Sequence, residues 1–375
     1  MIKIKRGLDL PITGSPEQRI EDARPVRSVA VVGFDYHGMK PTMEGREGDR
    51  VKLGQILFSD KKTPGVVFTA PAAGTISAIN RGEKSVVIDI DGDDAVSFDA
   101  HSAAALEQLT DQQVRDQLIA SGLWTALRTR PFSKTPAVDA KPSSIFVTAM
   151  DSNPLAADPA GIIKQHAAEF ENGLKVLARM AKVWLCKADG VNLPGENVSG
   201  VSTESFAGPH PAGLAGTHIH YLDPVGETKS VWQINYQDVI AFGVLFTEGR
   251  IWTDRYVALA GPQVEKPRLL KTRLGAQLDE LTAGELKSGE NLLITGSVFG
   301  GRLARGPVAF LGRFHSQVSV LKEGTERQML HYLRAGVKKH SVLNIFISKL
   351  NPSRLFDFDT STNGSPRAMV PVGNY

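Results

Sequence analysis

Cysteine is almost absent from this sequence, since Cys186 is the only one among 375 residues. A single thiol excludes a disulfide within the chain, a cysteine-based zinc site and an iron–sulfur cluster. The commonest ways of carrying electrons without an organic cofactor are therefore excluded for these residues. Cys186 lies in the apolar run VWLCKA, which predicts a small buried side chain rather than a reactive one.

Long hydrophobic runs are also missing. The longest, VIAFGVLF at 239–246, falls far short of the roughly 20 residues that span a bilayer. The N-terminus carries lysines but lacks the apolar core of a signal peptide. We therefore expect a protein that is cytoplasmic, or peripheral to a membrane that other subunits cross.

The net charge of +3 is too small to indicate a nucleic-acid partner. The charge is uneven, however, because residues 301–375 form a basic C-terminal segment with four acidic side chains against eleven basic ones. The basic residues are Arg302, Arg305, Arg313, Lys322, Arg327, Arg334, Lys338, Lys339, Lys349, Arg354 and Arg367. A basic face suits anionic headgroups or an acidic partner, and a solvated surface is the alternative.

Residues 31–100 contain short, evenly spaced strand patterns. Apolar runs begin at Val51, Val66 and Val86, and glycines such as Gly54 and Gly74 fall between runs, where the chain must turn. Strands this short predict a small closed β sandwich. Residues 1–30, which are polar and contain three prolines, precede it as an extended N-terminal arm.

The halves GDRVKLGQIL and APAAGTI of this region resemble the biotinyl/lipoyl-carrier fold, in which a lysine at a hairpin tip receives the cofactor. Lys61 and Lys62 lie in the corresponding interval. The sequence Thr63-Pro64-Gly65 follows them and lengthens and stiffens a loop that would have to present one lysine alone. We therefore expect unmodified lysines and a structural or docking role for this carrier-like sandwich.

Residues 101–255 alternate between helix and strand patterns. Helices are expected over 101–118, with Gly122 as the stop, and from Pro159 onward. The segments 144–150 and 183–189 are apolar enough for buried strands. Strand, loop, helix and strand form a βαβ unit, so a parallel, Rossmann-like α/β domain is predicted.

Residues 256–300 read as strand, short helix and strand, which favours a small β-grasp (soluble-ligand-binding) domain. The helix is expected over 272–286, with Gly284 near its end. The chain as a whole is thus predicted to be an α/β, or α+β, multidomain protein.

A glycine- and histidine-rich stretch at 208–222 contains His210, His218 and His220. His218 and His220 would share a face in a strand, which raises the possibility of a metal site. No third ligand follows at a convincing spacing, so a packed loop with hydrogen-bonded histidines is the favoured interpretation.

Four separated segments carry a close family resemblance: MIKIKRGLDLPITGSPEQ, VKLGQILFSDKKTPGVVFTAPAAGTI, GPHPAGLAGTHIHYLDPV and GSPRAMVPVGNY. In this order they resemble the A subunit of the sodium-translocating NADH:quinone oxidoreductase, over residues 1–375. The family continues beyond GSPRAMVP through a mostly helical tail with cysteines. A C-terminally truncated chain is therefore expected.

The family is more distantly similar to the flavin- and NADH-binding subunit of respiratory complex I. There, SGL precedes a glycine-rich loop whose backbone amides approach the flavin phosphate. Here Ser121-Gly122-Leu123 is kept, but WTALRTRPF at 124–132 follows. Its leucine and arginine side chains would fill the space of a phosphate, and Pro131 removes a donor. The resemblance thus implies a lost flavin site and binding of neither FMN nor NADH.

The resemblance further implies a cofactor-free subunit on the cytoplasmic side of the bacterial inner membrane, within a pump of six subunits. The pump oxidises NADH, reduces ubiquinone and exports Na⁺, and other subunits carry the flavins and the iron–sulfur centre. This subunit would act in assembly and at the quinone-reducing end, beside a membrane subunit, without catalysis of its own. The alternatives are an autonomous flavin- or NADH-binding oxidoreductase, disfavoured by the absence of G-x-G-x-x-G after a strand, and a biotin or lipoyl carrier.

A quinone headgroup needs a flat apolar surface and one or two donors for its carbonyls. Two loops offer such groups, and both are predicted to contribute to a quinone site. The first, after the strand expected at 28–33, supplies Phe34, Tyr36, His37 and Met39. The second replaces the flavin loop and supplies Arg130, Phe132 and Lys134.

Overall fold

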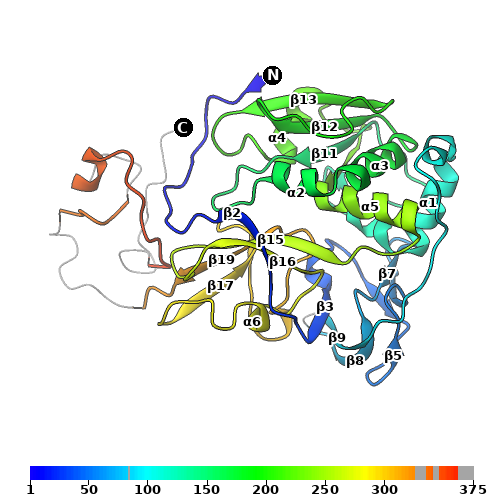
Figure 1. The fold of residues 1–375 in the computed structure, drawn as a ribbon, viewed down its shortest axis with the longest axis horizontal. Helices are drawn as coiled ribbons and strands as arrows, with labels where there is room; N and C mark the ends of the chain where they lie inside the picture. Colours follow the sequence, from blue (N-terminus) through cyan, green and yellow to red (C-terminus); the bar gives the residue numbers. More distant parts are fainter. Residues whose placement is uncertain (83–84, 326–334, 341–345, 362–375) are drawn as a thin grey trace.

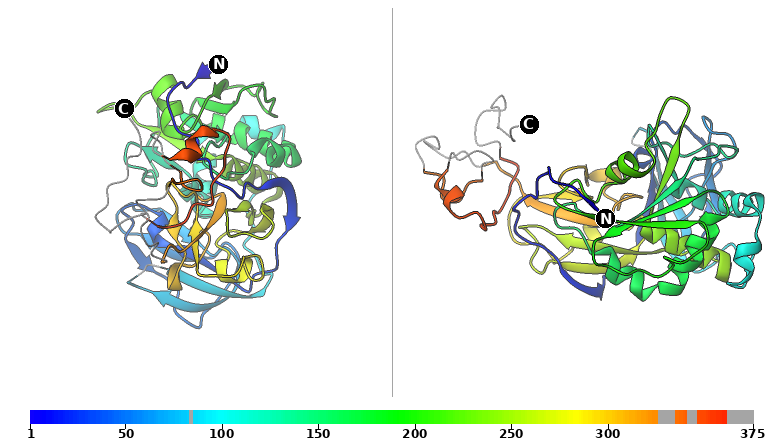
Figure 2. Two further views of the ribbon diagram at one scale, coloured as in Figure 1. Left: turned by 90° about the vertical axis from the view of Figure 1, so that its left-hand side faces the viewer. Right: turned by 90° about the horizontal axis from the view of Figure 1, so that it is seen from above.

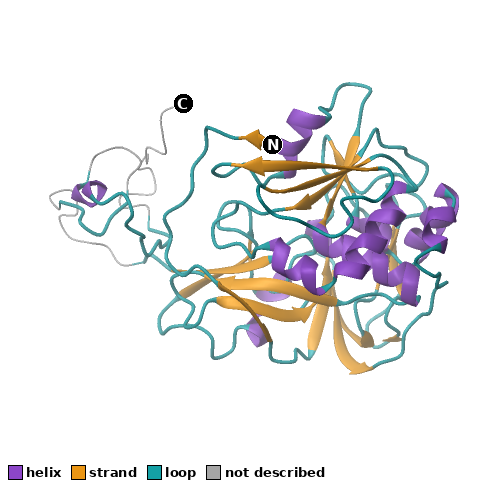
Figure 3. Cartoon of the chain, turned by 45° about the horizontal axis from the view of Figure 1, so that its top comes forward, coloured by secondary structure: helices purple, strands orange, loops and turns teal. Residues whose placement is uncertain are grey.

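The computed structural model of the chain describes residues 1–82, 85–325, 335–340 and 346–361. It is a mixed α/β protein with several sheets, and most of the helices gather between the largest parallel sheet and the remaining strands (Figures 1 and 3). None of the helices in these residues combines the length and the apolar character that crossing a bilayer requires.

The first part of the chain folds into two small antiparallel sheets, ordered β3-β9-β8-β5 and β4-β6-β7. Alternate side chains of each strand point inward, so Ile76 and Ile88 are buried together with Leu57 and Phe68. The strands expected at 28–33 and from the apolar runs at Val51, Val66 and Val86 are confirmed, whereas β4 lies in a stretch expected to be a loop. The strands of the two sheets are β3 Ser28–Val32, β4 Pro41–Met43, β5 Arg50–Val51, β6 Ile56–Asp60, β7 Val67–Thr69, β8 Ala73–Asn80 and β9 Ser85–Gly92, and a short 3-10 helix, η1 Gly33–Asp35, follows β3.

The predicted parallel layer is a six-stranded sheet, ordered β1-β13-β12-β11-β14-β10, in which only β10 is antiparallel to its neighbour. Its strands are β1 Ile2–Lys3, β10 Arg128–Arg130, β11 Ile145–Ala149, β12 Val183–Ala188, β13 Val201–Ala207 and β14 Val231–Asn235. The strands expected at 144–150 and 183–189 are thus confirmed as β11 and β12.

Helices cover both faces of this sheet. In β11, Val147 packs into the core that contains the helices on one face, whereas Phe146 points to the other face and packs in a cluster with Ile219. This alternation follows from the period of two in a strand. The helices are α2 Pro159–Gln165, α3 Ala167–Ala178 and α5 Tyr236–Glu248 on the first face and α4 Ala215–Leu222 on the second.

Two glycines allow α3 and α5 to pack closely. A Cβ atom on Gly173 would lie 1.9 Å from the carbonyl oxygen of Val239, and one on Gly243 would lie 1.9 Å from that of Glu169. Any side chain at either position would push the helices apart. The apolar run 239–246 is therefore the buried centre of α5.

The helix expected over 101–118 begins later than predicted, because α1 spans Asp111–Ala120. Thr110 starts it with a capping box: its hydroxyl accepts from the Gln113 N–H while the Gln113 side chain accepts from the Thr110 N–H. Only a short 3-10 turn, η2 Ala105–Gln108, precedes it. Gly122, with φ at 76°, ends the helix as predicted, and η3 Leu123–Ala126 follows.

A second six-stranded sheet has the order β18-β17-β19-β15-β16-β2. The helix expected over 272–286 is wrong for most of its length, because Thr272 belongs to a strand that pairs with β15 on one side and β2 on the other. Only α6 Leu278–Leu281 is helical. The strands are β2 Glu17–Asp22, β15 Asp254–Ala260, β16 Arg268–Arg273, β17 Asn291–Thr295, β18 Arg302–Leu303 and β19 Gln317–Lys322.

The described part of the C-terminal segment includes η4 Gly306–Val308 and η6 Ile347–Leu350. Of the described residues after β19, the stretch that contains η6 projects away from the main body (Figure 2), and Phe356 and Asp359 form bridges with Ile12 and Lys322. Of the basic residues noted in the sequence, Arg327, Arg334 and Arg367 lie outside the described residues.

Candidate functional site

A cavity of about 550 Å³ opens at the carboxyl ends of β11 and β14. From β11 the chain continues to β12 and β13 on one side, whereas β14 lies on the other. Such a reversal of strand order leaves a crevice in which open parallel sheets commonly bind their ligands. The carboxyl ends contribute Thr148, Met150, Asp151, Asn153, Gln233, Ile234, Asn235 and Tyr236 to the lining.

The segment that replaces the flavin loop forms one wall of the cavity. Arg128 and Arg130 alternate in β10, so their side chains lie on the same face. The Arg128 guanidinium stacks 4.3 Å from the ring centre of Phe314, and Arg130 donates from Nε to Gln233 Oε1 at 3.1 Å. Burial lowers the pKa of both, that of Arg128 to about 10, so both remain charged at neutral pH.

The sheet that contains β15 supplies a third wall through loops 296–300 and 314–317. His315 is held there because its Nδ1 lies 2.9 Å from Thr295 Oγ1, which in turn accepts from the Gly312 N–H. Thr295 Oγ1 can donate to Nδ1 or accept from it, so this contact positions the ring without fixing its tautomer. Burial lowers the pKa of His315 and favours the neutral imidazole.

The first predicted loop divides into buried and exposed residues. The Tyr36 ring packs between Phe68, at 4.6 Å, and Phe314, at 5.9 Å, and its hydroxyl bonds to Thr125. Burial raises the pKa of Tyr36 to about 12. Met39 is also buried, whereas Phe34, with 55% of its surface exposed, and His37 are accessible. Tyr36 therefore lies behind Phe314, which lines the cavity, and Met39 lies in the main core.

The second predicted loop presents an apolar tip. Phe132 is 76% exposed, and its φ of 75° is unusual for a residue with a bulky side chain. The turn is held by bonds from the Thr129 N–H to the Lys134 carbonyl and from the Ser133 N–H to the Thr129 carbonyl. Lys134 is exposed beside the first loop, since a Cβ atom on Gly38 would lie 3.6 Å from its Cε.

The two loops thus lie side by side at Gly38 and Lys134, but His37, Phe132 and Lys134 line neither the main cavity nor the hollow beside it. A smaller hollow lined by Phe34, Asp35 and Arg302 shares Arg128, Gly300, Phe314 and His315 with the main cavity. Phe34 and Arg130 therefore line parts of one continuous concavity. Sequence reasoning did not single out Arg128, Gln233, Phe314 or His315; the alternation in RTR at 128–130 was the signal available for Arg128.

The other candidates from the sequence lie elsewhere. His218 and His220 are in helix α4 rather than in a strand; His218 is buried with Nε2 2.9 Å from the Ala212 carbonyl oxygen. His210 bonds to Ser152. The residues that the structure describes contain no group of three or more His, Cys, Asp or Glu side chains placed to hold a metal ion. Cys186 is buried, as expected, and burial raises its pKa.

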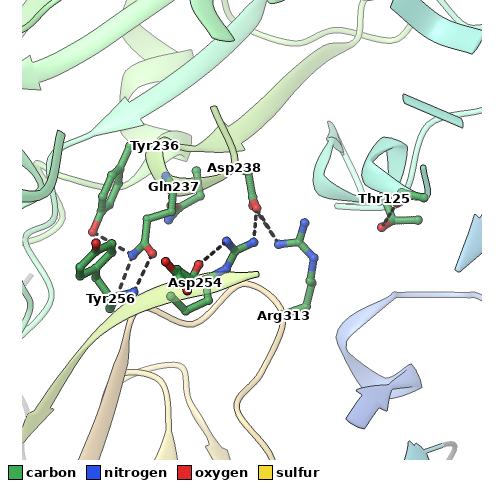
Figure 4. A network of polar contacts seen from close by, with 10 residues as sticks. Thr125, Tyr236, Gln237, Asp238, Asp254, Tyr256 and Arg313 are labelled. Atoms are coloured by element: carbon green, nitrogen blue, oxygen red, sulfur yellow. Dashed lines mark hydrogen bonds and ion pairs between the residues drawn. The ribbon is translucent and has the colours of Figure 1, made fainter. Parts of the chain in front are cut away.

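A buried ionic network beneath the cavity joins the sheets. Asp238 of α5 accepts from Nη2 of Arg255 at 2.6 Å and from Nη1 of Arg313 at 2.9 Å (Figure 4). Burial would lower the pKa of Arg313, but Asp238 and other acidic groups outweigh the effect of burial, so the pKa of Arg313 is raised. At Arg255 burial is the stronger effect and lowers the pKa to about 10. The backbone N–H of Arg313 also donates to the carboxylate of Asp35 in the first domain. The network therefore fixes three parts of the chain against one another.

Comparison with known proteins identifies the family. Three family models match: the NqrA N-terminal barrel-sandwich hybrid domain over residues 2–92, the NqrA second alpha/beta domain over 109–251 and the NQRA C-terminal domain over 256–306. The A subunit of the Na(+)-translocating NADH-quinone reductase of Pseudomonas aeruginosa is 66% identical over 379 residues, which cover 100% of this chain and 85% of that protein. The protein of the same name from Cellvibrio japonicus is 63% identical with the same coverage.

Among solved structures, an NAD⁺-reducing [NiFe]-hydrogenase in its H₂-reduced state aligns with 59% of this chain and 49% of its own, at 14% identity and a TM-score of 0.41. That likeness is too weak to argue from. The family models and the full-length relatives are decisive, and the chain belongs to the NqrA family, the A subunits of the Na⁺-translocating NADH-quinone reductases.

Proposed function

We propose that this chain is a peripheral, cofactor-free subunit of a bacterial Na⁺-pumping NADH:ubiquinone oxidoreductase and acts at the ubiquinone-reducing end and in assembly. The names of its full-length relatives support the complex, the reaction and the transported ion. Catalysis belongs to the assembled complex rather than to this chain alone. Its partners are the other members of a six-subunit assembly, above all the membrane subunit that lies at the quinone site, and no nucleic acid.

The proposed location is the cytoplasmic side of the inner membrane. Support comes from the absence of a membrane-spanning helix in the described residues and from the basic surplus of residues 301–375. Anionic headgroups or an acidic neighbour would complement that surplus.

We also propose finer domain assignments. Residues 31–100 form a biotinyl/lipoyl-carrier-like sandwich after the arm 1–30, residues 101–255 a Rossmann-like domain and residues 256–300 a β-grasp domain, before the basic segment 301–375. The barrel-sandwich description of the family model and the parallel sheet support the first two. The sheet of the third also takes in β2 and β19, which lie outside 256–300.

The proposal assigns FMN, NADH and the iron–sulfur centre to other subunits. In its favour, the glycine-rich loop whose backbone amides would approach a flavin phosphate is replaced here by a segment that carries Arg128 and Arg130. An autonomous flavin- or NADH-binding oxidoreductase is the alternative, and a biotin or lipoyl carrier is a second. Flavin absorbance that stays with the purified chain through gel filtration would favour the first of these.

The quinone site is proposed at the concave surface between the two loops. The observation that carries it is that the exposed side chain of Phe34 and the Arg128 guanidinium line one hollow, which adjoins the cavity lined by Arg128 and Arg130. Phe132, which is also exposed, follows Arg130 by two residues at the tip of the second loop. An aromatic ring can stack on a quinone, a guanidinium can donate to its carbonyl, and His37 can supply a proton on reduction. Lys134 is exposed on the second loop beside Gly38, and the buried Tyr36 ring supports Phe314 of the cavity wall. Met39 is proposed to hold the first loop from the core.

The test is to replace Phe132 and His37 separately by alanine in the complete complex. Binding of a quinone analogue and turnover are expected to fall by about fivefold or more with Phe132→Ala, from the loss of about 1 kcal/mol of stacking. Tyr221→Ala is the matched control, since Tyr221 is an exposed aromatic residue on α4. If both variants assemble normally and neither binding nor turnover changes, the quinone site belongs to another subunit.

A further inference from the structure

The cavity at the ends of β11 and β14 contains more positive charge than its surroundings balance. Within the described residues, neither Arg128 nor Arg130 forms an ion pair: Arg128 stacks on Phe314, and Arg130 donates to the neutral amide of Gln233. Burial of an unpaired guanidinium is unfavourable. The two side chains therefore have unused N–H donors in a partly desolvated space.

The nearest carboxylates are already engaged. Asp238 is shared between Arg255 and Arg313. Asp35 accepts from the Arg313 N–H and lies 3.6 Å from Arg302. Three guanidiniums thus already face these two carboxylates, so neither can neutralise the arginines of β10 as well.

Asp151 is the one acidic residue in the lining of the main cavity. Its Oδ1 accepts from both the backbone N–H and the side-chain amide of Asn153, each at 2.8 Å. Burial raises its pKa, and it forms no ion pair in the described part of the chain. Asp151 is therefore a poor counter-ion for Arg128 and Arg130.

The opposite wall adds further donors. Helix α4 begins at Ala215 without a capping side chain, and Leu214, Ala215, Gly216 and Thr217 line the cavity. The Thr217 N–H bonds back to the Leu214 carbonyl, whereas those of Ala215 and Gly216 have no partner in the residues described. Free N–H groups at the start of a helix favour an anion.

We propose that this cavity binds a phosphate-type oxyanion, held by Arg128 and Arg130 and by the first N–H groups of α4. The proposal goes beyond the proposed function, because a neutral quinone supplies no negative charge. A planar guanidinium suits the oxygens of a phosphate, to which it can donate two parallel bonds. The cavity of about 550 Å³ beside the two arginines leaves room for a small molecule that carries the phosphate. The side chains of 124–132 therefore do not fill the space of a phosphate, as the sequence suggested; they replace the glycine-rich backbone that would bind a flavin phosphate.

The test is isothermal titration calorimetry of the whole chain with two probes, inorganic phosphate and AMP, at constant ionic strength. Arg128→Gln is expected to weaken binding at least about tenfold, since hydrogen bonds to charged groups are the strong ones. Ala215→Pro removes one N–H while keeping a residue that the first position of a helix accepts, and it should weaken binding several-fold. Arg305→Gln, an exposed arginine of the same sheet region, should leave binding unchanged.

Tighter binding of AMP than of phosphate would identify a phosphate ester as the ligand, and equal binding would identify free phosphate. Arg130→Gln repeats the test if Arg128→Gln fails to fold. The proposal is overturned if neither probe binds at millimolar concentration, or if binding survives in folded Arg128→Gln and Arg130→Gln. Quinone-analogue binding is measured on the same samples, so that failure of this proposal and failure of the quinone site are told apart.

Discussion

The buried network around Asp238 allows a stability prediction with a defined size. Asp238→Asn keeps the volume of the side chain but removes the only carboxylate that contacts both Arg255 and Arg313 in the described residues. Removal of one partner from a buried ion pair typically costs about 3–5 kcal/mol, because the other charge stays buried without compensation. Here two guanidiniums lose their partner, so we expect the upper half of that range.

Asp254→Asn is the matched control. Asp254 is on β15 directly before Arg255 and pairs with Lys271 at 3.0 Å, but about a third of each side chain is exposed, at 35% and 38%. Pairs of this kind contribute only about 0–1 kcal/mol. The same chemical change at neighbouring positions should therefore differ by about 3 kcal/mol or more in the free energy of unfolding.

The assay is urea-induced unfolding followed by tryptophan fluorescence. All four tryptophans lie between residues 124 and 252, so the signal reports on the domain that contains Asp238. Addition of Arg313→Gln to Asp238→Asn should recover part of the loss, because it removes one of the two uncompensated charges. The reasoning is refuted if the two single variants lose the same stability to within about 0.5 kcal/mol.

Two further predictions concern pH and modification. Burial lowers the pKa of His218 to about 4, so between about pH 6.5 and pH 4 the unfolded chain binds a proton that the folded chain does not. The free energy of unfolding should fall by up to about 3 kcal/mol as the pH drops through this window. The dependence of that free energy on pH should be shallower in His218→Gln but unchanged in His220→Gln. Equal pH dependences in the two variants would argue against a role of His218. Lys61 and Lys62 are exposed on the β6–β7 hairpin, and we expect the intact mass to equal that of the unmodified sequence, whereas an increment of biotin or lipoate there would contradict a structural role.

The elements that the sequence predicted well are those in which local signals and tertiary contacts agree. The strand at 28–33, those at 144–150 and 183–189 and the helix stop at Gly122 are apolar runs or a glycine in a left-handed conformation. In each case the burial of the strand or the end of the helix agrees with the preference of its own residues.

The misses have tertiary causes. Residues 272–286 carry a pattern compatible with a helix, but pairing with both β15 and β2 draws Thr272 into a strand. The enclosure of the Tyr36 ring by Phe68 and Phe314 is likewise a tertiary contact that the local sequence does not indicate, and the part of Tyr36 in a quinone site stays a prediction. The cavity itself combines five segments, near residues 128, 150, 215, 233 and 315. No single stretch of the sequence predicts a site that is assembled from five segments.

The pairing of the first strands has a consequence for the order of synthesis. β1 pairs with β13 through Ile2 and Phe206, and β2 pairs with β16 through Asp22 and Lys271. Neither β13 nor β16 has been synthesised when the N-terminal arm leaves the ribosome. The pairing of β1 and of β2 therefore forms only after these later strands are available. During translation the arm therefore stays unpaired and exposes its backbone N–H and C=O groups, and the second six-stranded sheet is completed only after β19 has emerged.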